Sequence, residues 1–387
     1  MFAFFQNACK RIAIPALMLL GLAACDAVPT STPGVASGTP VPVALLVPGG
    51  SGQTTDELLA QSLENAARLA MRDLNGVAVD LRVYRTAGDA ALAGALAEKA
   101  VDEGAKIIIG PVYAASANAA GKAVAGRNVN VLSFSNNSAI AGGNLFVLGP
   151  TFQNTADRVV GYATSQGKQR FVIVHGQDSA GIQGRDAIQR AVLNNGALVT
   201  ASVGYALSQQ DVIAAIPNIS AAVTENAADA LFMTTDSASA LPLLSQLLPE
   251  AGITSETAQF MGLTRWDIPP QTLSLPGVQN GWFALPDPGA TSAFSNQYQA
   301  AYATAPHPIG GLAFDAIAAI GALASQGGAG ALSTSSLTRS GGFRGASGIF
   351  RLNVDGSNSR GLAIATISEA QVRILSPAPQ RFGGLGF

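Results

Sequence analysis

The chain has 387 residues, of which 48% are apolar and 12% charged, and its formal net charge is −2. This apolar content excludes intrinsic disorder for most of the chain, and the near-neutral charge disfavours a nucleic-acid binder, which needs a basic face. With only two Cys and two His, a four-cysteine zinc site cannot be built.

The N-terminal segment has the pattern of an export signal. A Lys-Arg pair at 10–11 precedes the apolar run Ile12–Ala24, which is shorter than the ~20 residues of a membrane-spanning helix. The run ends in Leu-Ala-Ala before Cys25, which resembles a bacterial lipobox. We expect residues 1–24 to be a lipoprotein signal peptide and Cys25 to carry lipid. The alternative is ordinary cleavage near Ala24 that leaves Cys25 unmodified.

The segment after the cysteine is rich in Pro, Thr, Ser and Gly and has no apolar period. This composition predicts a flexible tether over residues 25–42. Asp26 resembles an inner-membrane retention signal of enterobacterial lipoproteins. We expect a periplasmic protein anchored to the inner or outer membrane.

The body then alternates strands with helices. Val43–Val47 is a continuous apolar run, typical of a strand buried on both faces, and a Gly-rich turn separates it from an amphipathic helix over Asp56–Leu74. The same alternation continues through strands at Val79–Val83, Lys106–Ile109 and Val129–Ser133 and helices at Asp89–Glu103 and Ala114–Gly126. Such a βαβ rhythm predicts a parallel sheet with helices on both faces.

A second unit of the same kind begins after Gly149-Pro150. Its predicted strands are Arg170–His175, Leu198–Tyr205, Ala230–Met233, Gln259–Gly262 and Gly281–Leu285. Its predicted helices, and two that follow it, are Thr151–Gln166, Ile182–Asn195, Asp211–Val223, Ala238–Leu248, Ser292–Ala303 and Gly310–Ser325.

The last part of the chain is predicted to be β-rich. Gly348–Leu352 and Gly361–Ile367 flank Asp355-Gly356, a turn signal, and Gln371–Leu375 is a possible third strand. The Pro/Gly-rich tail from Ser376 is expected to be extended.

Signatures of catalysis are absent from the sequence. There is no Gly-x4-Gly-Lys-Ser/Thr, no Gly-x-Gly-x-x-Gly after the first strand and no Gly-x-Ser-x-Gly. His175 and His307 are the only imidazoles, and His175 could line a cleft because it ends a predicted strand. We therefore expect no enzyme, no cofactor and no metal, and keep an enzyme as the third hypothesis.

Ligands of open α/β sheets bind beyond the carboxyl ends of the strands. The loops there are short and polar, and two such edges could close on a ligand across a hinge. They fit ordinary βα turns equally well. The loops are Pro48–Gln53, Gly110–Ser116, Ser133–Ser138, Gly176–Gly181, Thr234–Ser237 and Leu263–Asp267.

Residues 41 to about 375 resemble a type I periplasmic binding protein of the leucine/isoleucine/valine-binding class. The resemblance rests on ordered segments, among them VPVALLVPGGSG, KIIIGPVYAAS, VNVLSFSNNSA, KQRFVIVHGQDSAG, DALFMTTDSASAL and AQFMGLTRWD. It implies an α/β fold of two lobes, each a parallel sheet flanked by helices, joined by a hinge. The expected division is 43–149 with 286–344 for lobe 1, 150–285 with 345–375 for lobe 2, and 376–387 as a tail.

A narrower resemblance points to a different role. FVLGPTFQNTADRVVGYATSQGKQRF, GWFALPDP and SGIFRLNVDGSNSRGLAI look like lipoproteins described as penicillin-binding-protein activators. This implies a membrane-anchored regulator whose partner is a peptidoglycan synthase. The alternative is a leucine-type or other amino-acid receptor that serves the permease of an ABC transporter.

The resemblance to amino-acid binders also implies where a ligand would lie. In amino-acid binders a Ser contacts the ligand carboxylate, and the matching position here is near Ala114, with Ser116 close by. An acid of those proteins pairs with the ligand ammonium, and Thr264 stands at that position. Since a buried ammonium without an anion is costly, this departure favours the regulator, although Asp236 or Asp267 could substitute. The full candidate set is Ser51, Tyr113, Ala114, Ser116, Ser135, Asn136, Asn137, Asp178, Asp236, Ser237, Thr264, Arg265 and Trp266.

Among the aromatic candidates, Tyr113 is placed equally well for a cleft or for packing. Trp266 could offer a stacking face beside Arg265, which suits a carboxylate or phosphate. Trp282 is expected to be a core or hinge aromatic rather than a sugar platform.

Overall fold

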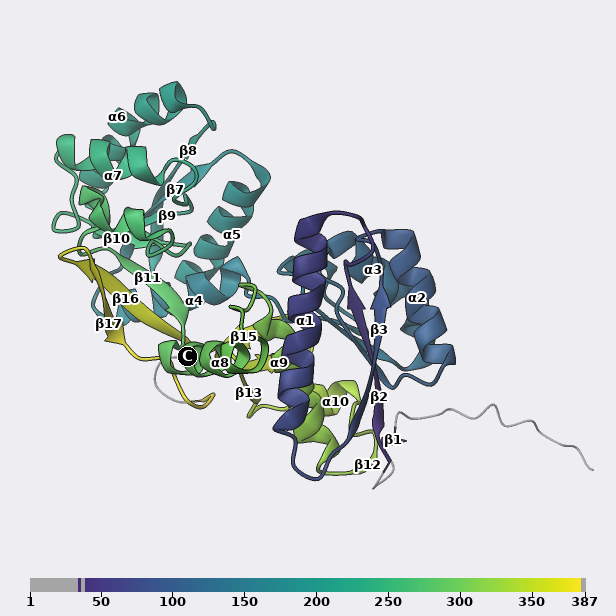
Figure 1. The fold of residues 1–387 in the computed structure, drawn as a ribbon. Helices are drawn as coiled ribbons and strands as arrows, with labels where there is room; N and C mark the ends of the chain where they lie inside the picture. Colours follow the sequence, from purple (N-terminus) through teal and green to yellow (C-terminus); the bar gives the residue numbers. More distant parts are fainter. Residues whose placement is uncertain (1–33, 36–38, 384–387) are drawn as a thin grey trace, which may run out of the picture. The chain divides into compact units, whose positions relative to one another are not determined.

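The protein consists of two open α/β sheets in two lobes, with helices on the faces of each (Figure 1). The computed structural model describes residues 34–35 and 39–383. These described residues form one compact unit. The expected signal peptide and lipidated Cys25 lie outside the described residues.

The first sheet has five strands in the order β3-β2-β4-β5-β6, and all its pairings are parallel, as predicted. Its strands are β2 (Val41–Val47), β3 (Val79–Arg85), β4 (Ile107–Ile109), β5 (Asn130–Ser133) and β6 (Leu145–Val147). Its helices are α1 (Thr54–Arg72), α2 (Ala90–Asp102) and α3 (Ala114–Val124). The short β6 was missed from the sequence.

Strand β2 shows why this sheet is covered on both faces. Alternate side chains point to opposite faces of a strand. Ala44 and Leu46 belong to the cluster formed with α2 and α3, whereas Val43 and Leu45 belong to the cluster formed with α1 and the later helix α9 (Gly311–Ala324). All four side chains are fully buried.

The second sheet has seven strands in the order β17-β16-β11-β10-β9-β7-β8. Five of them, β7 to β11, are parallel, and β16 and β17 are antiparallel additions. The strands are β7 (Arg170–Gly176), β8 (Leu198–Tyr205), β9 (Ala230–Met233), β10 (Gln259–Gly262), β11 (Trp282–Pro286), β16 (Leu362–Ser368) and β17 (Gln371–Ser376).

Helices cover both faces of this sheet as well. Phe171 and Ile173 of β7 pack with α4 (Phe152–Ser165) and α5 (Ser179–Asn194), and the intervening Val172 and Val174 pack with α6 (Gln209–Glu225) and α7 (Leu241–Glu250). The remaining strands are β1 (Gly34–Val35), β12 (Gly328–Ala329), β13 (Phe343–Gly345), β14 (Gly348–Leu352) and β15 (Asn358–Arg360). The helices are α8 (Pro288–Tyr302) and α10 (Thr334–Leu337), with 3₁₀ turns Ala125–Arg127, Ser138–Ile140, Pro270–Ser274 and Pro276–Val278.

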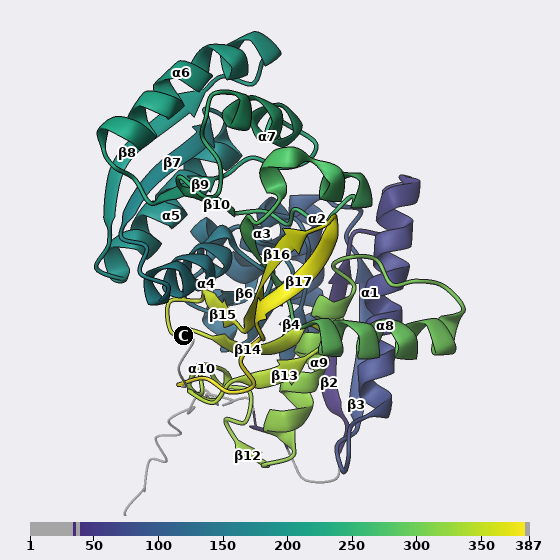
Figure 2. The ribbon, with the colours of Figure 1, turned by 90° about the vertical axis from the view of Figure 1, so that its left-hand side faces the viewer.

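The chain passes between the lobes after β6, after β11 and after β15 (Figure 2). Asn358 ties these crossings together, because its Nδ2 donates to Val147 O (2.8 Å) and Gly149 O (2.9 Å) while its own carbonyl accepts from Asn154 Nδ2 (2.8 Å). Arg360 donates to Leu148 O in the same crossing.

A buried ion pair lies beside these crossings. Arg360 Nη1 lies 3.0 Å from Asp315 Oδ2, and the side chains are only 4% and 1% exposed. Asp315 Oδ1 also accepts from Ala346 N at 2.7 Å. Burial raises the pKa of Asp315, and the charge of Arg360 and the Ala346 N–H oppose that rise.

Three of the differences from the sequence expectations concern the tether, a turn and a lobe boundary. The tether was expected to run to residue 42, but Gly34–Val35 pairs with β12 and β2 begins at Val41. The turn at Asp355-Gly356 joins β14 to the short β15, not to the strand after residue 361. Phe350 and Leu352 belong to the lobe 1 core, so we place the last lobe boundary near residue 361 instead of 345.

Candidate functional site

The loops at the carboxyl end of the first sheet are joined by hydrogen bonds to one carboxylate. Asp56, in the first turn of α1, accepts from Ser51 Oγ at 2.8 Å and from the phenol of Tyr113. This bond to the carboxylate raises the pKa of Tyr113, with burial adding to the effect. The Tyr113 side chain remains 40% exposed, so it can still meet a ligand.

The start of α3 is left without a capping side chain. Tyr113 is the N-cap residue, but its hydroxyl is turned to Asp56 and makes no cap hydrogen bond. The backbone N–H groups of the first helical turn, from Ala114 onward, are the unsatisfied donors of a helix start and attract an anion. The hydroxyl of Ser116 is not available to a ligand, because the side chain is fully buried and donates to Gly88 O at 3.1 Å.

The loop after β5 is fixed by its own backbone. Ser135 is buried and its Oγ accepts from Asn137 N at 3.1 Å, while Asn137 Oδ1 accepts from Ala139 N at 3.0 Å. Asn136 is exposed between them. Of these three candidates, Asn136 therefore has the most accessible side chain.

The second sheet presents carboxylates at its carboxyl end. Asp178 caps α5 by accepting from Gly181 N at 3.2 Å, and Asp236 accepts from Ala238 N at 3.1 Å. Both are exposed. Tyr205, at the end of β8, lies near enough to be affected by both: burial raises its pKa, and the two carboxylates add to the rise. This end of the second lobe is therefore anionic.

Two further candidates serve the loops themselves. Thr264 Oγ1 donates to Thr235 O at 3.0 Å, and Ser237 Oγ donates to Ile268 O at 2.9 Å. These bonds join the loop after β9 to the loop after β10. Arg265 is bound through Nε to Asp267 Oδ1 (2.9 Å) and through Nη2 to Oδ2, so neither charge is unpaired.

The expectation that Trp266 offers a stacking face is wrong. Its side chain is fully buried beside Phe283, with ring centroids 6.3 Å apart. A Cβ added at Gly262 or Gly281 would lie 2.4 Å and 2.3 Å from the indole, so the ring fills the space between two glycine backbones. Trp282, as expected, packs in the protein, edge-on to Tyr162 at 5.0 Å.

Sequence reasoning missed two apolar side chains at the same end of the second lobe. Leu207 follows β8 and is 60% exposed, and Ile268 follows β10 and is 53% exposed. It also missed Tyr205. The signal that could have found them is position alone, since Tyr205 ends β8, Leu207 lies two residues beyond it and Ile268 lies in the loop that follows β10.

No helix within residues 34–35 and 39–383 is long and apolar enough to cross a bilayer. In the same part of the chain, no three His, Cys, Asp or Glu side chains are grouped to hold a metal ion.

Comparison with known proteins identifies the family. Residues 40–371 match the family model described as periplasmic binding protein. Because the match covers most of the chain, this protein belongs to the periplasmic binding protein family. A search of curated proteins finds no match.

Solved structures share the fold over nearly their whole length. A putative branched-chain amino acid ABC transporter protein from Rhodospirillum rubrum is similar with a TM-score of 0.73 and 16% identity, covering 87% of this chain and 100% of that one. A branched-chain amino acid ABC transporter periplasmic ligand-binding protein from Burkholderia xenovorans gives 0.66 and 16%, covering 88% and 96%. An ABC transporter substrate-binding protein from Desulfitobacterium hafniense in complex with Leu gives 0.61 and 16%, covering 87% and 100%.

These comparisons confirm the two-lobed α/β fold and the type I binding-protein resemblance. They give no support to the narrower resemblance to penicillin-binding-protein activators, and they favour the alternative of a solute receptor.

Proposed function

We propose that this protein is the solute receptor of an ABC-type uptake system and that its ligand is an aliphatic amino acid. The observation that carries the proposal is the complementary chemistry of the two strand-end loop sets. The first lobe offers uncapped N–H groups at the start of α3, and the second offers carboxylates beside apolar side chains.

The carboxylate of the ligand would bind in the first lobe. The first turn of α3 provides backbone donors together with the positive end of the helix dipole. Tyr113 lies at this turn, and its hydroxyl donates to Asp56 and makes no hydrogen bond that caps the helix.

The ammonium of the ligand would bind in the second lobe. Asp267 is unsuitable because Arg265 already pairs with both its oxygens. Asp236 is exposed, and no Lys, Arg or His in the described chain forms an ion pair with it. This supports Asp236 as the anion that the sequence alone left unassigned.

The side chain of the ligand would contact Leu207 and Ile268. Exposed apolar side chains beside a polar site suit an aliphatic group, whose burial is worth about 25 cal/mol per Å². The names of the similar structures, which include a complex with Leu, support the same ligand class.

Isothermal titration of residues 39–387 with leucine, isoleucine and valine tests the proposal. Isoamylamine lacks the carboxylate and 4-methylpentanoate lacks the ammonium, so each should bind at least tenfold more weakly than leucine. Absence of binding by all three amino acids, or equal binding of the two truncated compounds, would refute it.

The variant Asp236→Asn tests the assigned anion. It should weaken leucine binding about tenfold or more, because a hydrogen bond to a charged group contributes about 1.5–3 kcal/mol. Glu256→Gln, an exposed acid in the loop before β10, is the matched control and should leave the affinity unchanged.

Membrane anchoring through Cys25 and a transporter permease as partner complete the proposal. The lipobox-like residues before Cys25 support the first, and the names of the similar ABC transporter proteins support the second. Incorporation of labelled palmitate into the wild type but not into Cys25→Ala would test the anchor.

A further inference from the structure

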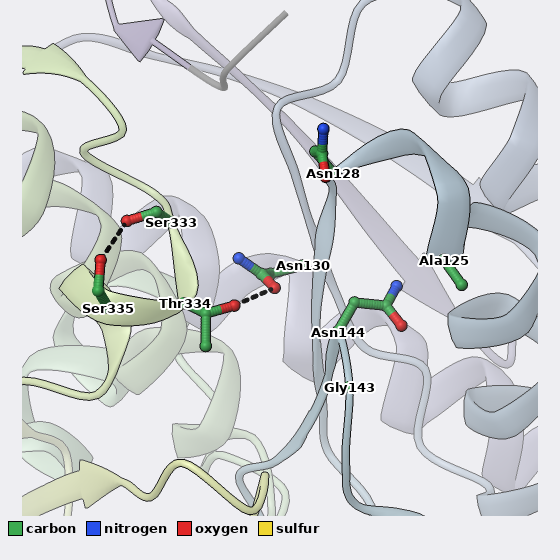
Figure 3. A pocket seen from close by; sticks show the side chains of 8 residues that line it. All are labelled: Ala125, Asn128, Asn130, Gly143, Asn144, Ser333, Thr334 and Ser335. Atoms are coloured by element: carbon green, nitrogen blue, oxygen red, sulfur yellow. Dashed lines mark hydrogen bonds between the residues drawn. The ribbon is translucent and has the colours of Figure 1, made fainter. Parts of the chain in front are cut away.

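A pocket of about 600 Å³ opens in lobe 1 away from the loops considered above (Figure 3). Two parts of the chain line it. One runs from the end of α3 to the residues before β6, and the other is the start of α10. The lining residues are Ala125, Asn128, Asn130, Gly143, Asn144, Ser333, Thr334 and Ser335.

The pocket lies at the opposite edge of the sheet from the proposed amino-acid site. Asn130 is the first residue of β5, and Asn144 directly precedes β6. The strands run in parallel, so these residues mark their amino ends. A ligand here would not compete with one at the carboxyl ends.

The amide side chains of the pocket are held in place by internal bonds. Asn144 Nδ2 donates to Gly121 O (3.1 Å) and Val129 O (3.0 Å). Asn130, only 5% exposed, donates to Leu332 O at 2.9 Å and accepts from Thr334 Oγ1 at 3.2 Å. The last bond joins the two sides of the pocket (Figure 3). Preorganised groups of this kind bind without a large ordering cost.

Several polar groups of the pocket remain available. Within the described chain, Asn144 Oδ1 accepts no hydrogen bond, and the side-chain amide of Asn128 makes none. The Ser335 hydroxyl bonds only to the Ser333 hydroxyl, at 3.0 Å. An Asn oxygen accepts, while an Asn amide and a Ser hydroxyl can also donate. The pocket is therefore complementary to a ligand whose groups both donate and accept hydrogen bonds.

None of the eight lining residues is charged. A charged ligand would lose hydration there without gaining a counter-charge. Hydroxyl groups meet both requirements, being neutral and able to donate and accept. We infer that this pocket is a second binding site, for a neutral polyhydroxylated molecule of the sugar or polyol class.

Saturation-transfer NMR and calorimetry with maltose, trehalose and sucrose, each up to 10 mM, test the inference. At least one should bind, and its affinity should not change when leucine is added. Glucuronate, which carries a charge, should bind at least tenfold more weakly. No binding by any of the three, or displacement by leucine, would overturn the inference.

The variant Ala125→Phe locates the site. Ala125 is exposed and lines the pocket, so a ring there narrows it without disturbing the core, and saccharide affinity should fall at least tenfold. Ala300→Phe, at an exposed alanine in the last turn of α8, is the matched control and should change affinity by less than twofold. Ser335→Ala should weaken binding about three- to tenfold, the worth of one hydrogen bond. Undiminished binding to Ala125→Phe would overturn the placement.

Discussion

The Asp315–Arg360 pair gives the sharpest prediction about stability. In Asp315→Asn the guanidinium of Arg360, 4% exposed, keeps its place without an anion, and Ala346 N–H faces a weaker acceptor. Removing one partner of a buried pair costs about 3–5 kcal/mol, because the other charge stays desolvated. With an unfolding entropy of about 2.1 cal/mol/K per residue, a body of this size should lose roughly 4–7 °C in melting temperature.

Calorimetry and urea unfolding measure this loss. The control is Asp102→Asn, the same chemical change in the exposed pair Arg127–Asp102, whose side chains are 47% and 66% exposed. Exposed pairs contribute about 0–1 kcal/mol, so that variant should unfold close to the wild type. The double variant Asp315→Leu with Arg360→Met should recover part of the loss, because no charge is left buried. Equal stabilities for the two Asp→Asn variants would refute the reasoning.

Three further outcomes follow from single residues. Burial and the bond to Glu103 raise the pKa of Tyr84 to about 12, so the folded state favours the neutral phenol. This contribution to stability is full below pH ~10 and is lost as the pH rises toward 12. The pH-dependent unfolding of Tyr84→Phe should lack that step. Gly110→Ala should fail to fold or lose several degrees in melting temperature, because φ is +79° and a Cβ would lie 2.2 Å from Leu46 O; a wild-type melting curve would contradict this. Trp266→Phe should lower stability by about 1–3 kcal/mol through a cavity, yet leave leucine affinity within twofold, and a selective loss of affinity would return Trp266 to the ligand site.

Several strands could be predicted with their exact ends. Leu198–Tyr205, Ala230–Met233 and Gln259–Gly262 have the predicted bounds, because polar or turn-forming residues close to each end mark their limits. Leu145–Val147 was missed because three residues carry no period. The Asp355-Gly356 turn was found, but its second strand is the polar Asn358–Arg360, whose residues do not look like a strand.

The site was harder to predict than the fold. A strand end tells which residues lie at an edge, but not which way a side chain turns. Ser116 and Trp266 stand in the expected loops and are both buried. The pairing of Arg265 with Asp267, which leaves Asp236 as the unpaired one of the two acids considered for the ammonium, depends on side-chain geometry that no sequence pattern encodes.

The pairing of β1 with β12 has a mechanical consequence. Gly34–Val35 forms a two-residue antiparallel contact with Gly328–Ala329, and five residues separate it from β2. A force that pulls on the chain ahead of residue 34 acts on the β1–β12 pairing before it acts on β2 in the first sheet. The contact would peel first, releasing slack of up to ~3.5 Å per freed residue. The seven paired residues of β2 would stay in register, so pulling on this end lengthens the chain ahead of β2 and spares the strands that position Ser51 and Tyr113.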